Sequence, residues 1–203
     1  MKRIVPVLVL MITLFTLVAC ATASSSASID ESERWYSIDH YSITAVMDEA
    51  GMMSVKEAIT ANFNGEYHGI VRTIPTSNDI RDIACSTEFS TGTENGSFLI
   101  RMGSASKLVS GAVEYKLDFF IDTKWTGGEF RYILLGDWDV DVTDLTFSFT
   151  VPATLFTGEN ISLYGGNTTG KVLETVDVGN GKLLIKGTIS VIPAHESLVL
   201  IIK

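Results

Sequence analysis

Three aspartates alternate with apolar residues in the second half of the chain. Asp137, Asp139 and Asp141 are separated by Trp138 and Val140, and alternate side chains of a β-strand face the same way. Three aligned carboxylates are weak candidates for a calcium site. The EF-hand motif is excluded, because valine and serine stand where its loop requires glycine and glutamate. Alternation predicts instead a solvated strand face, and no metal or other cofactor is expected.

A second set combines an acid, a base and a cation: Glu57, His68 and Arg72. The chain contains no nucleophile elbow of the Gly-x-Ser-x-Gly type, and its three histidines show no spacing typical of zinc ligands. A glycan hydrolase would need two acids facing one groove, roughly 5 to 9 Å apart. Glu57, Asp137, Asp139 and Asp141 are the acids available for that alternative, but no motif predicts an enzyme.

The cysteine at position 20 follows a signal-peptide pattern. Lys2 and Arg3 precede an apolar run over residues 4–17, which ends in Leu-Val-Ala before Cys20. The run is shorter than the ~20 apolar residues that a spanning helix needs. Residues 1–19 are therefore predicted to be a lipoprotein signal peptide, removed before Cys20. A palmitate-containing diacylglyceryl group on Cys20 would hold the protein to the bilayer, because two acyl chains anchor firmly.

The other cysteine, Cys85, has no intrachain partner once Cys20 carries lipid, so no disulfide is expected. No Cys-x-x-Cys pattern or nearby histidine supports a reactive thiol at Cys85. Free cysteine is among the most buried residue types, and Cys85 is interpreted as a small core residue.

Residues 20–34 form a Ser/Ala-rich stretch that cannot pack and is predicted to be a flexible tether. Residues 35–203 then suit one domain. The sequence has 15 Lys plus Arg against 24 Asp plus Glu, and loss of Lys2 and Arg3 makes the mature chain more acidic. Nucleic acid is therefore excluded as a partner, since it requires clustered cations.

The positioning elements are predicted to be strands, because apolar residues recur with period two almost throughout. Roughly ten short strands separated by glycine-containing turns predict an all-β fold, a β-sandwich. The predicted strands cover residues 41–47, 53–63, 79–86, 97–102, 113–121, 130–135, 145–151, 160–164, 175–178, 182–187 and 197–202.

The segment HGIVRTIP at residues 68–75 is expected to be structural first. Gly65 and Gly69 permit a tight turn, and Ile70, Val71 and Ile74 are apolar enough to enter the core. An extended chain would place His68 and Arg72 on one face, and Pro75 would stop the pairing. A partly buried guanidinium needs an acid, and Glu57 on the preceding strand is the predicted partner of Arg72.

This segment, placed just after the strand VKEAIT at residues 55–60, resembles the hallmark of the domain of unknown function 2207 family. The strand at 113–122, the segment LGDWDV at 135–140 and the turn IPAHESL at 192–198 are also similar to that family. The resemblance covers roughly residues 37–202 and marks Glu57, His68, Gly69, Arg72 and Pro75 as a structural or binding motif.

The resemblance implies an extracytoplasmic β-sandwich, usually on a membrane protein that continues into transmembrane helices, with no established activity. This chain is expected to use the lipid on Cys20 in place of those helices. The predicted location is the extracytoplasmic face of the cell membrane. The predicted function is a non-catalytic binding or assembly module of the cell envelope, with a protein or glycan partner. The alternative is an envelope hydrolase acting on peptidoglycan or polysaccharide.

Overall fold

The computed structural model describes residues 35–125, 128–155, 161–165 and 170–203. The predicted signal peptide and tether, and with them Cys20, lie outside these ranges. The described residues form strands and their connections, with no helix among them. The predicted all-β fold is therefore confirmed.

The larger layer is a seven-stranded sheet with the order β11-β12-β9-β1-β2-β7-β4. Strands β1 and β9 pair in parallel, whereas every other neighbouring pair in this sheet is antiparallel. The bounds are β1 (Trp35–Met47), β2 (Met52–Tyr67), β4 (Asp79–Cys85), β7 (Val109–Asp122), β9 (Val142–Pro152), β11 (Val172–Gly179) and β12 (Lys182–Ile192).

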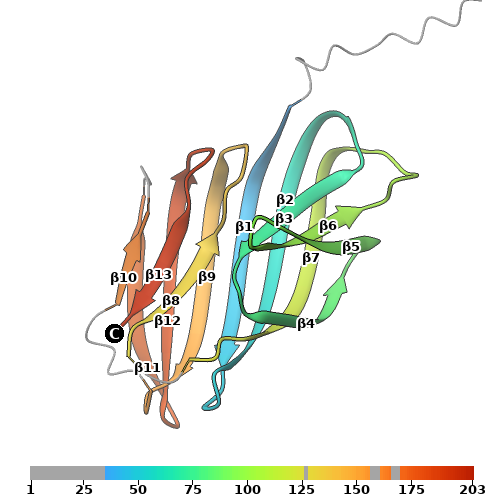
Figure 1. Cartoon of the computed structure of the whole chain (residues 1–203). Helices are drawn as coiled ribbons and strands as arrows, with labels where there is room; N and C mark the ends of the chain where they lie inside the picture. The colour runs from blue at the N-terminus through green and yellow to red at the C-terminus, as the bar shows by residue number, and fades with distance from the viewer. Residues whose placement is uncertain (1–34, 126–127, 156–160, 166–169) are drawn as a thin grey trace, which may run out of the picture.

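Two three-stranded sheets cover one face of the large sheet (Figure 1). One has the order β10-β13-β8 and the other β3-β6-β5, so within the described residues β8 and β3 each pair on one side only. We call the line along which β8 and β3 face each other without a strand ladder between them the seam. The bounds are β3 (Gly69–Pro75), β5 (Phe89–Glu94), β6 (Ser97–Gly103), β8 (Phe130–Leu135), β10 (Ile161–Tyr164) and β13 (Leu198–Ile202).

Alternation explains which side of the large sheet is buried. Val55, Ile59, Ala61 and Phe63 of β2 face the second layer and are each at most 4% exposed. Burying valine, isoleucine and phenylalanine side chains in this way stabilises the fold by about 1.5 to 3 kcal/mol each. Glu57 occupies the same inward row and is equally buried. It is the charged exception in an otherwise apolar face.

The structure contains two strands, β3 and β5, that alternation does not predict. In β3 a charged residue, Arg72, sits at an inward position between Ile70 and Ile74, which hides the apolar period. In β5 no residue is buried, so the strand has no apolar face to detect. The predicted end of the strand at residues 53–63 is also wrong. Strand β2 continues to Tyr67 with an irregular register after Phe63.

Candidate functional site

A buried ion pair joins the two layers of the sandwich. Arg72 of β3 reaches Glu57 of β2, with Nε donating to Oε2 at 2.9 Å and Nη2 donating to Oε1 at 2.9 Å. Both side chains are fully enclosed. The pairing predicted from the sequence is present, with the two-pronged geometry in which Arg–carboxylate pairs are strongest.

The remaining polar contacts of this pair come from further strands. The Tyr41 hydroxyl of β1 donates to Glu57 Oε2 at 2.7 Å. The Arg72 guanidinium also donates through Nη1 to the Thr73 carbonyl at 2.7 Å, and through Nη2 to the Leu134 carbonyl of β8 at 3.3 Å. We call Tyr41, Glu57 and Arg72 the Arg72 cluster. It links four strands from three sheets and crosses the seam.

Burial and charge together set the ionisation of the cluster. Burial by itself lowers the pKa of Arg72, but the Glu57 carboxylate, with Tyr41, raises it above the ordinary value. Burial raises the pKa of Tyr41, and the charge of Glu57 adds to that rise while Arg72 opposes it. The guanidinium therefore stays charged and the phenol neutral, as their hydrogen bonds require.

Close contacts hold the seam shut beside the cluster. A Cβ added to Gly136, just after β8, would lie 2.7 Å from the Thr73 carbonyl oxygen. The Arg72 guanidinium lies 5.7 Å from the centre of the Tyr41 ring, which in turn meets Trp138 edge to face at 6.2 Å. Glycine is needed at position 136 because the two backbones approach so closely.

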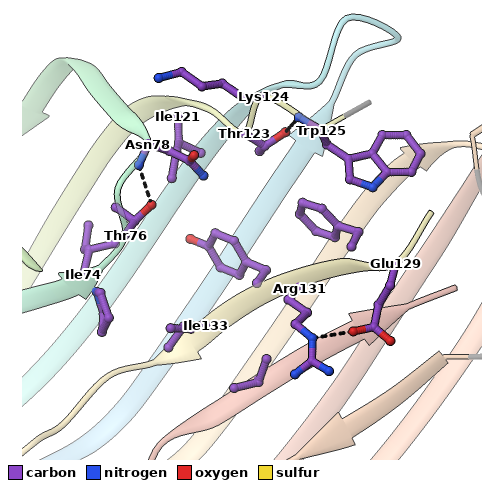
Figure 2. A pocket seen from close by; sticks show the side chains of 14 residues that line it. Ile74, Thr76, Asn78, Ile121, Thr123, Lys124, Trp125, Glu129, Arg131 and Ile133 are labelled. Atoms are coloured by element: carbon purple, nitrogen blue, oxygen red, sulfur yellow. Dashed lines mark hydrogen bonds and ion pairs between the residues drawn. The ribbon is translucent and has the colours of Figure 1, made fainter. Parts of the chain in front are cut away.

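Further along the seam, β3 and β8 enclose a cavity of about 510 Å³. Figure 2 shows Ile74 and Asn78 on one side of it, with Ile133 and Arg131 across from them. The volume lies in the range of small-ligand sites. The lining residues are Ile74, Pro75, Thr76, Asn78, Ile121, Thr123, Lys124, Trp125, Glu129, Phe130, Arg131, Tyr132, Ile133 and Val199.

The charged residues of this seam cavity are paired with one another or with neighbours. Lys124 Nζ lies 3.5 Å from Asp79. Glu129 contacts Arg131, and it also lies 3.1 Å from Lys203 Nζ. The cavity therefore presents an apolar wall and a rim in which charge is largely compensated, with Thr76, Asn78 and Thr123 as uncharged polar groups.

One wall residue, Tyr132, carries an unsatisfied polar atom. Its hydroxyl is buried and has no hydrogen-bond partner among the described residues. Burial raises the pKa of Tyr132, the charge of Glu57 raises it further, and Arg72 lowers it. A buried hydroxyl without a partner costs about 1 to 3 kcal/mol, so this group lowers the stability of the fold.

The seam cavity lies at the end of the sandwich away from the start of β1. Thr123 in its wall is bound to the β1–β2 turn, since its backbone N–H donates to the Gly51 carbonyl at 3.2 Å. The 13 residues of β1 span roughly 40 Å between that turn and Trp35. In Figure 1 the first strand begins at the upper end and this turn lies at the lower end.

The predicted motif residues are divided along β3. Glu57 and Arg72 lie in the buried cluster, and Pro75 ends β3 and lines the seam cavity. His68 is exposed at the other end of the strand, 3.1 Å from the Ser104 carbonyl, so it does not share the face of Arg72. Gly69 fits its position because its φ is +130° and an added Cβ would overlap the Met102 carbonyl. Val71, expected in the core, is exposed.

The three aspartates do not form the predicted strand face. Residues 136–141 connect β8 to β9 without pairing, although Trp138 and Val142 still point inward. Asp137 contacts His195 at 3.0 Å, Asp139 accepts from the Tyr36 hydroxyl at 2.5 Å, and Asp141 accepts from the Ala194 N–H at 2.8 Å. Each carboxylate thus has its own partner. Within the described ranges no group of three acids, histidines or cysteines could hold a metal ion.

Sequence reasoning did not single out the wall of the seam cavity. Its residues come from the ends of β3 and β7, from β8 and from β13, which lie far apart in the chain. The available signal was Trp125, which stands between two predicted strands, with one residue between it and a pair of glycines. Cys85 is partly buried against the core, with its sulfur 3.7 Å from Thr87 Oγ1.

Solved structures resemble this chain only distantly. The M1 zinc metallopeptidase from Deinococcus radiodurans is 12% identical, with a TM-score of 0.49 over 81% of this chain and 42% of that one. Native leukotriene A4 hydrolase from Saccharomyces cerevisiae is 12% identical, with a TM-score of 0.48 over 81% of this chain and 28% of that one. The chain spans less than half the length of either protein. No curated protein matches it.

A family model covers most of the domain. The one described as "Predicted membrane protein (DUF2207) N-terminal domain" matches residues 37–198. This range contains the Arg72 cluster and nearly all of the seam cavity. A search of the described residues finds no helix that is long and apolar enough to cross a bilayer. The chain belongs to the family of predicted membrane proteins with the domain of unknown function 2207, and it carries the N-terminal domain of that family.

Proposed function

We propose that this protein is a non-catalytic binding module of the cell envelope, anchored to the extracytoplasmic face of a membrane by lipid on Cys20. The seam cavity is its ligand site. The observation that carries this proposal is a cavity of ligand size with an apolar wall and uncharged polar groups at its rim. The membership in a family of predicted membrane proteins supports the membrane location.

The position of the cavity agrees with an anchor at the N-terminus. The tether would enter the domain at Trp35, and the seam cavity lies at the other end of β1. A ligand at that site would be held roughly 40 Å from the point where the tether enters. The ligand site would therefore face away from the membrane surface, into the space outside the membrane.

The alternative of a hydrolase receives no support from the four acids considered for it. Both carboxylate oxygens of Glu57 are already hydrogen-bonded in the core. Asp137, Asp139 and Asp141 each contact a different neighbour at the surface. None of these three aspartates lines the seam cavity. Two acids facing one groove are what glycan hydrolysis would require.

The anchor is tested by labelling cells with radioactive palmitate. The wild-type chain should incorporate the label and Cys20→Ala should not, because the thiol is the site of attachment. An unlabelled wild-type chain would contradict the lipid anchor.

The ligand site is tested by capture from envelope extracts with a cavity-filling variant. Ile133→Trp enlarges a half-buried side chain in the wall of the seam cavity. Glu49→Trp is the matched control, because Glu49 is exposed in the β1–β2 turn at the same end of the molecule. Material that binds the wild type and Glu49→Trp should be lost from Ile133→Trp. Equal retention by all three proteins would overturn the assignment of the site.

A further inference from the structure

We propose that the ligand of the seam cavity is an extended peptide segment, which binds by adding a strand to β8 along Arg131, Tyr132 and Ile133. This inference rests on the proposed function, since it concerns the same cavity. The main chain that borders the site indicates the chemistry of the ligand.

The second layer is built from two separate sheets. Strand β8 is bonded to β13 on one side, and β3 is bonded to β6 on one side, with no ladder between β8 and β3. The other sides of β8 and β3 face each other across the seam. An unpaired strand edge presents a row of N–H and C=O groups that accepts another strand.

The cavity follows the course of β8. Phe130 and Tyr132 point into the sandwich, whereas Arg131 and Ile133 point outward, and all four line the cavity. A cavity on either face of a strand would touch alternate residues only. Contact with the consecutive residues Arg131, Tyr132 and Ile133 means that the cavity runs along the edge of the strand.

The cavity extends from the strand edges down to the large sheet. Besides the strand edges, it reaches Ile121 of β7 in the large sheet, and the buried Ile74 lines it from β3. An apolar side chain of an added strand would enter this space. Peptides that add to sheet edges gain affinity from main-chain hydrogen bonds and specificity from pockets for alternate side chains.

Charge at the rim of the cavity is largely compensated. Lys124 is paired with Asp79, and Glu129 with Arg131 and Lys203. The rim therefore gives no strong preference for a highly charged segment. The geometry points to a peptide with an apolar residue at its centre and uncharged neighbours.

The experiment pans the purified full-length protein, in detergent micelles, against a phage-displayed library of linear decapeptides. A glycan array is probed in parallel. We expect enrichment of peptides with a central Ile, Leu, Val or Phe, whose binding is retained by Glu49→Trp and lost in Ile133→Trp. Methylating the backbone nitrogen at alternate peptide positions should weaken binding by about tenfold for each hydrogen bond removed.

A second measurement uses the wild-type protein alone, so it does not depend on the folding of a variant. Addition of the selected peptide should slow hydrogen exchange at backbone amides of β8, while the edge strand β11 remains unchanged. Peptides that bind without this protection, or that tolerate methylation, would overturn the inference. Glycans alone binding in a manner blocked by Ile133→Trp would overturn the peptide while leaving the proposed function intact. No Ile133→Trp-sensitive binding of either kind would overturn both.

Discussion

The seam between β3 and β8 is closed at one end and open at the other. At the closed end the Arg72 guanidinium fills the gap and bonds to the carbonyls of Thr73 and Leu134, on both of its sides. At the open end a cavity separates Ile74 from Ile133. A charged side chain thus replaces the missing strand ladder where the two sheets meet. Beyond the reach of Arg72, no side chain among the described residues takes the place of a ladder between β3 and β8.

The same contrast holds for the two buried phenols of the seam. The Tyr41 hydroxyl donates to Glu57 at the closed end. The Tyr132 hydroxyl, in the wall of the open end, has no partner in the described part of the chain. Satisfied polar groups fix the position of neighbouring strands, whereas an unsatisfied one lowers stability locally. The four predictions below test this contrast, beginning with the largest effect.

Arg72→Ala should lower the free energy of unfolding by about 3 to 5 kcal/mol, because it leaves the Glu57 carboxylate buried without its cation. Urea denaturation followed by circular dichroism measures the change. Lys186→Ala is the control, since Lys186 forms an exposed pair with Glu174 at 2.9 Å and should cost less than ~1 kcal/mol. The double variant Glu57→Ala/Arg72→Ala should lose little more than either single one. An Arg72→Ala protein of wild-type stability would contradict the structural role of the closed end.

Alkaline pH should destabilise the domain through both phenols. Folding raises the pKa of Tyr41 and of Tyr132 above the ordinary tyrosine value of 10.0, so the unfolded chain loses these protons first. Their contribution is complete below pH 10 and is lost as pH rises above it. Tyr41 and Tyr132 contribute about 2 kcal/mol to the loss between pH 10 and 11, and Tyr36 and Tyr115, whose pKa burial also raises, add to it. Urea midpoints measured across this range check it, and a flat profile would argue against two buried neutral phenols.

Tyr41→Phe should lower the free energy of unfolding by about 1 to 2 kcal/mol, because Glu57 loses a hydrogen bond from a buried donor. The ring, and with it the edge-to-face contact with Trp138, is retained. Thermal and urea denaturation measure the loss. If stability is unchanged, the hydroxyl does not support the ion pair.

Tyr132→Phe should have the smallest effect and the opposite sign. Removing a buried hydroxyl without a partner should leave stability unchanged or raise it by up to ~1 kcal/mol. Measured beside Tyr41→Phe, it compares the same chemical change at the two ends of the seam. Equal destabilisation by both variants would show that the two phenols have equivalent environments.

The closed end was predictable from the sequence because it follows from local rules. Strand alternation places Glu57 on the core face of β2, and a guanidinium at a core position requires an acid. Glu57 and Arg72 lie on consecutive strands, β2 and β3, so their pairing needed no knowledge of the topology. The charge of Arg72 at an inward position also interrupts the apolar alternation of β3, so that alternation did not predict this strand.

The open end was not predictable, because the strands β3 and β8 that border it are 55 residues apart in the sequence, counted from Pro75 to Phe130. Pro75 and Phe130 meet only through the arrangement of two separate small sheets. Alternation describes the faces of a strand and contains no information about its edges. For the segment 137–141, alternation correctly predicted that Trp138 points inward. It wrongly predicted a paired strand, because this segment carries the chain from one layer to the other.

The parallel pairing of β1 with β9 has a consequence for how the chain folds. Ile38 lies opposite Val142 and Ala45 opposite Phe149, so one side of the first strand is completed by a segment made about a hundred residues later. During synthesis β1 can form a hairpin with β2, but its second edge stays exposed until β9 has emerged. Pairings of such long range slow folding and leave an apolar edge open to other chains in the meantime. The period before β9 arrives is therefore when this domain is most prone to aggregation.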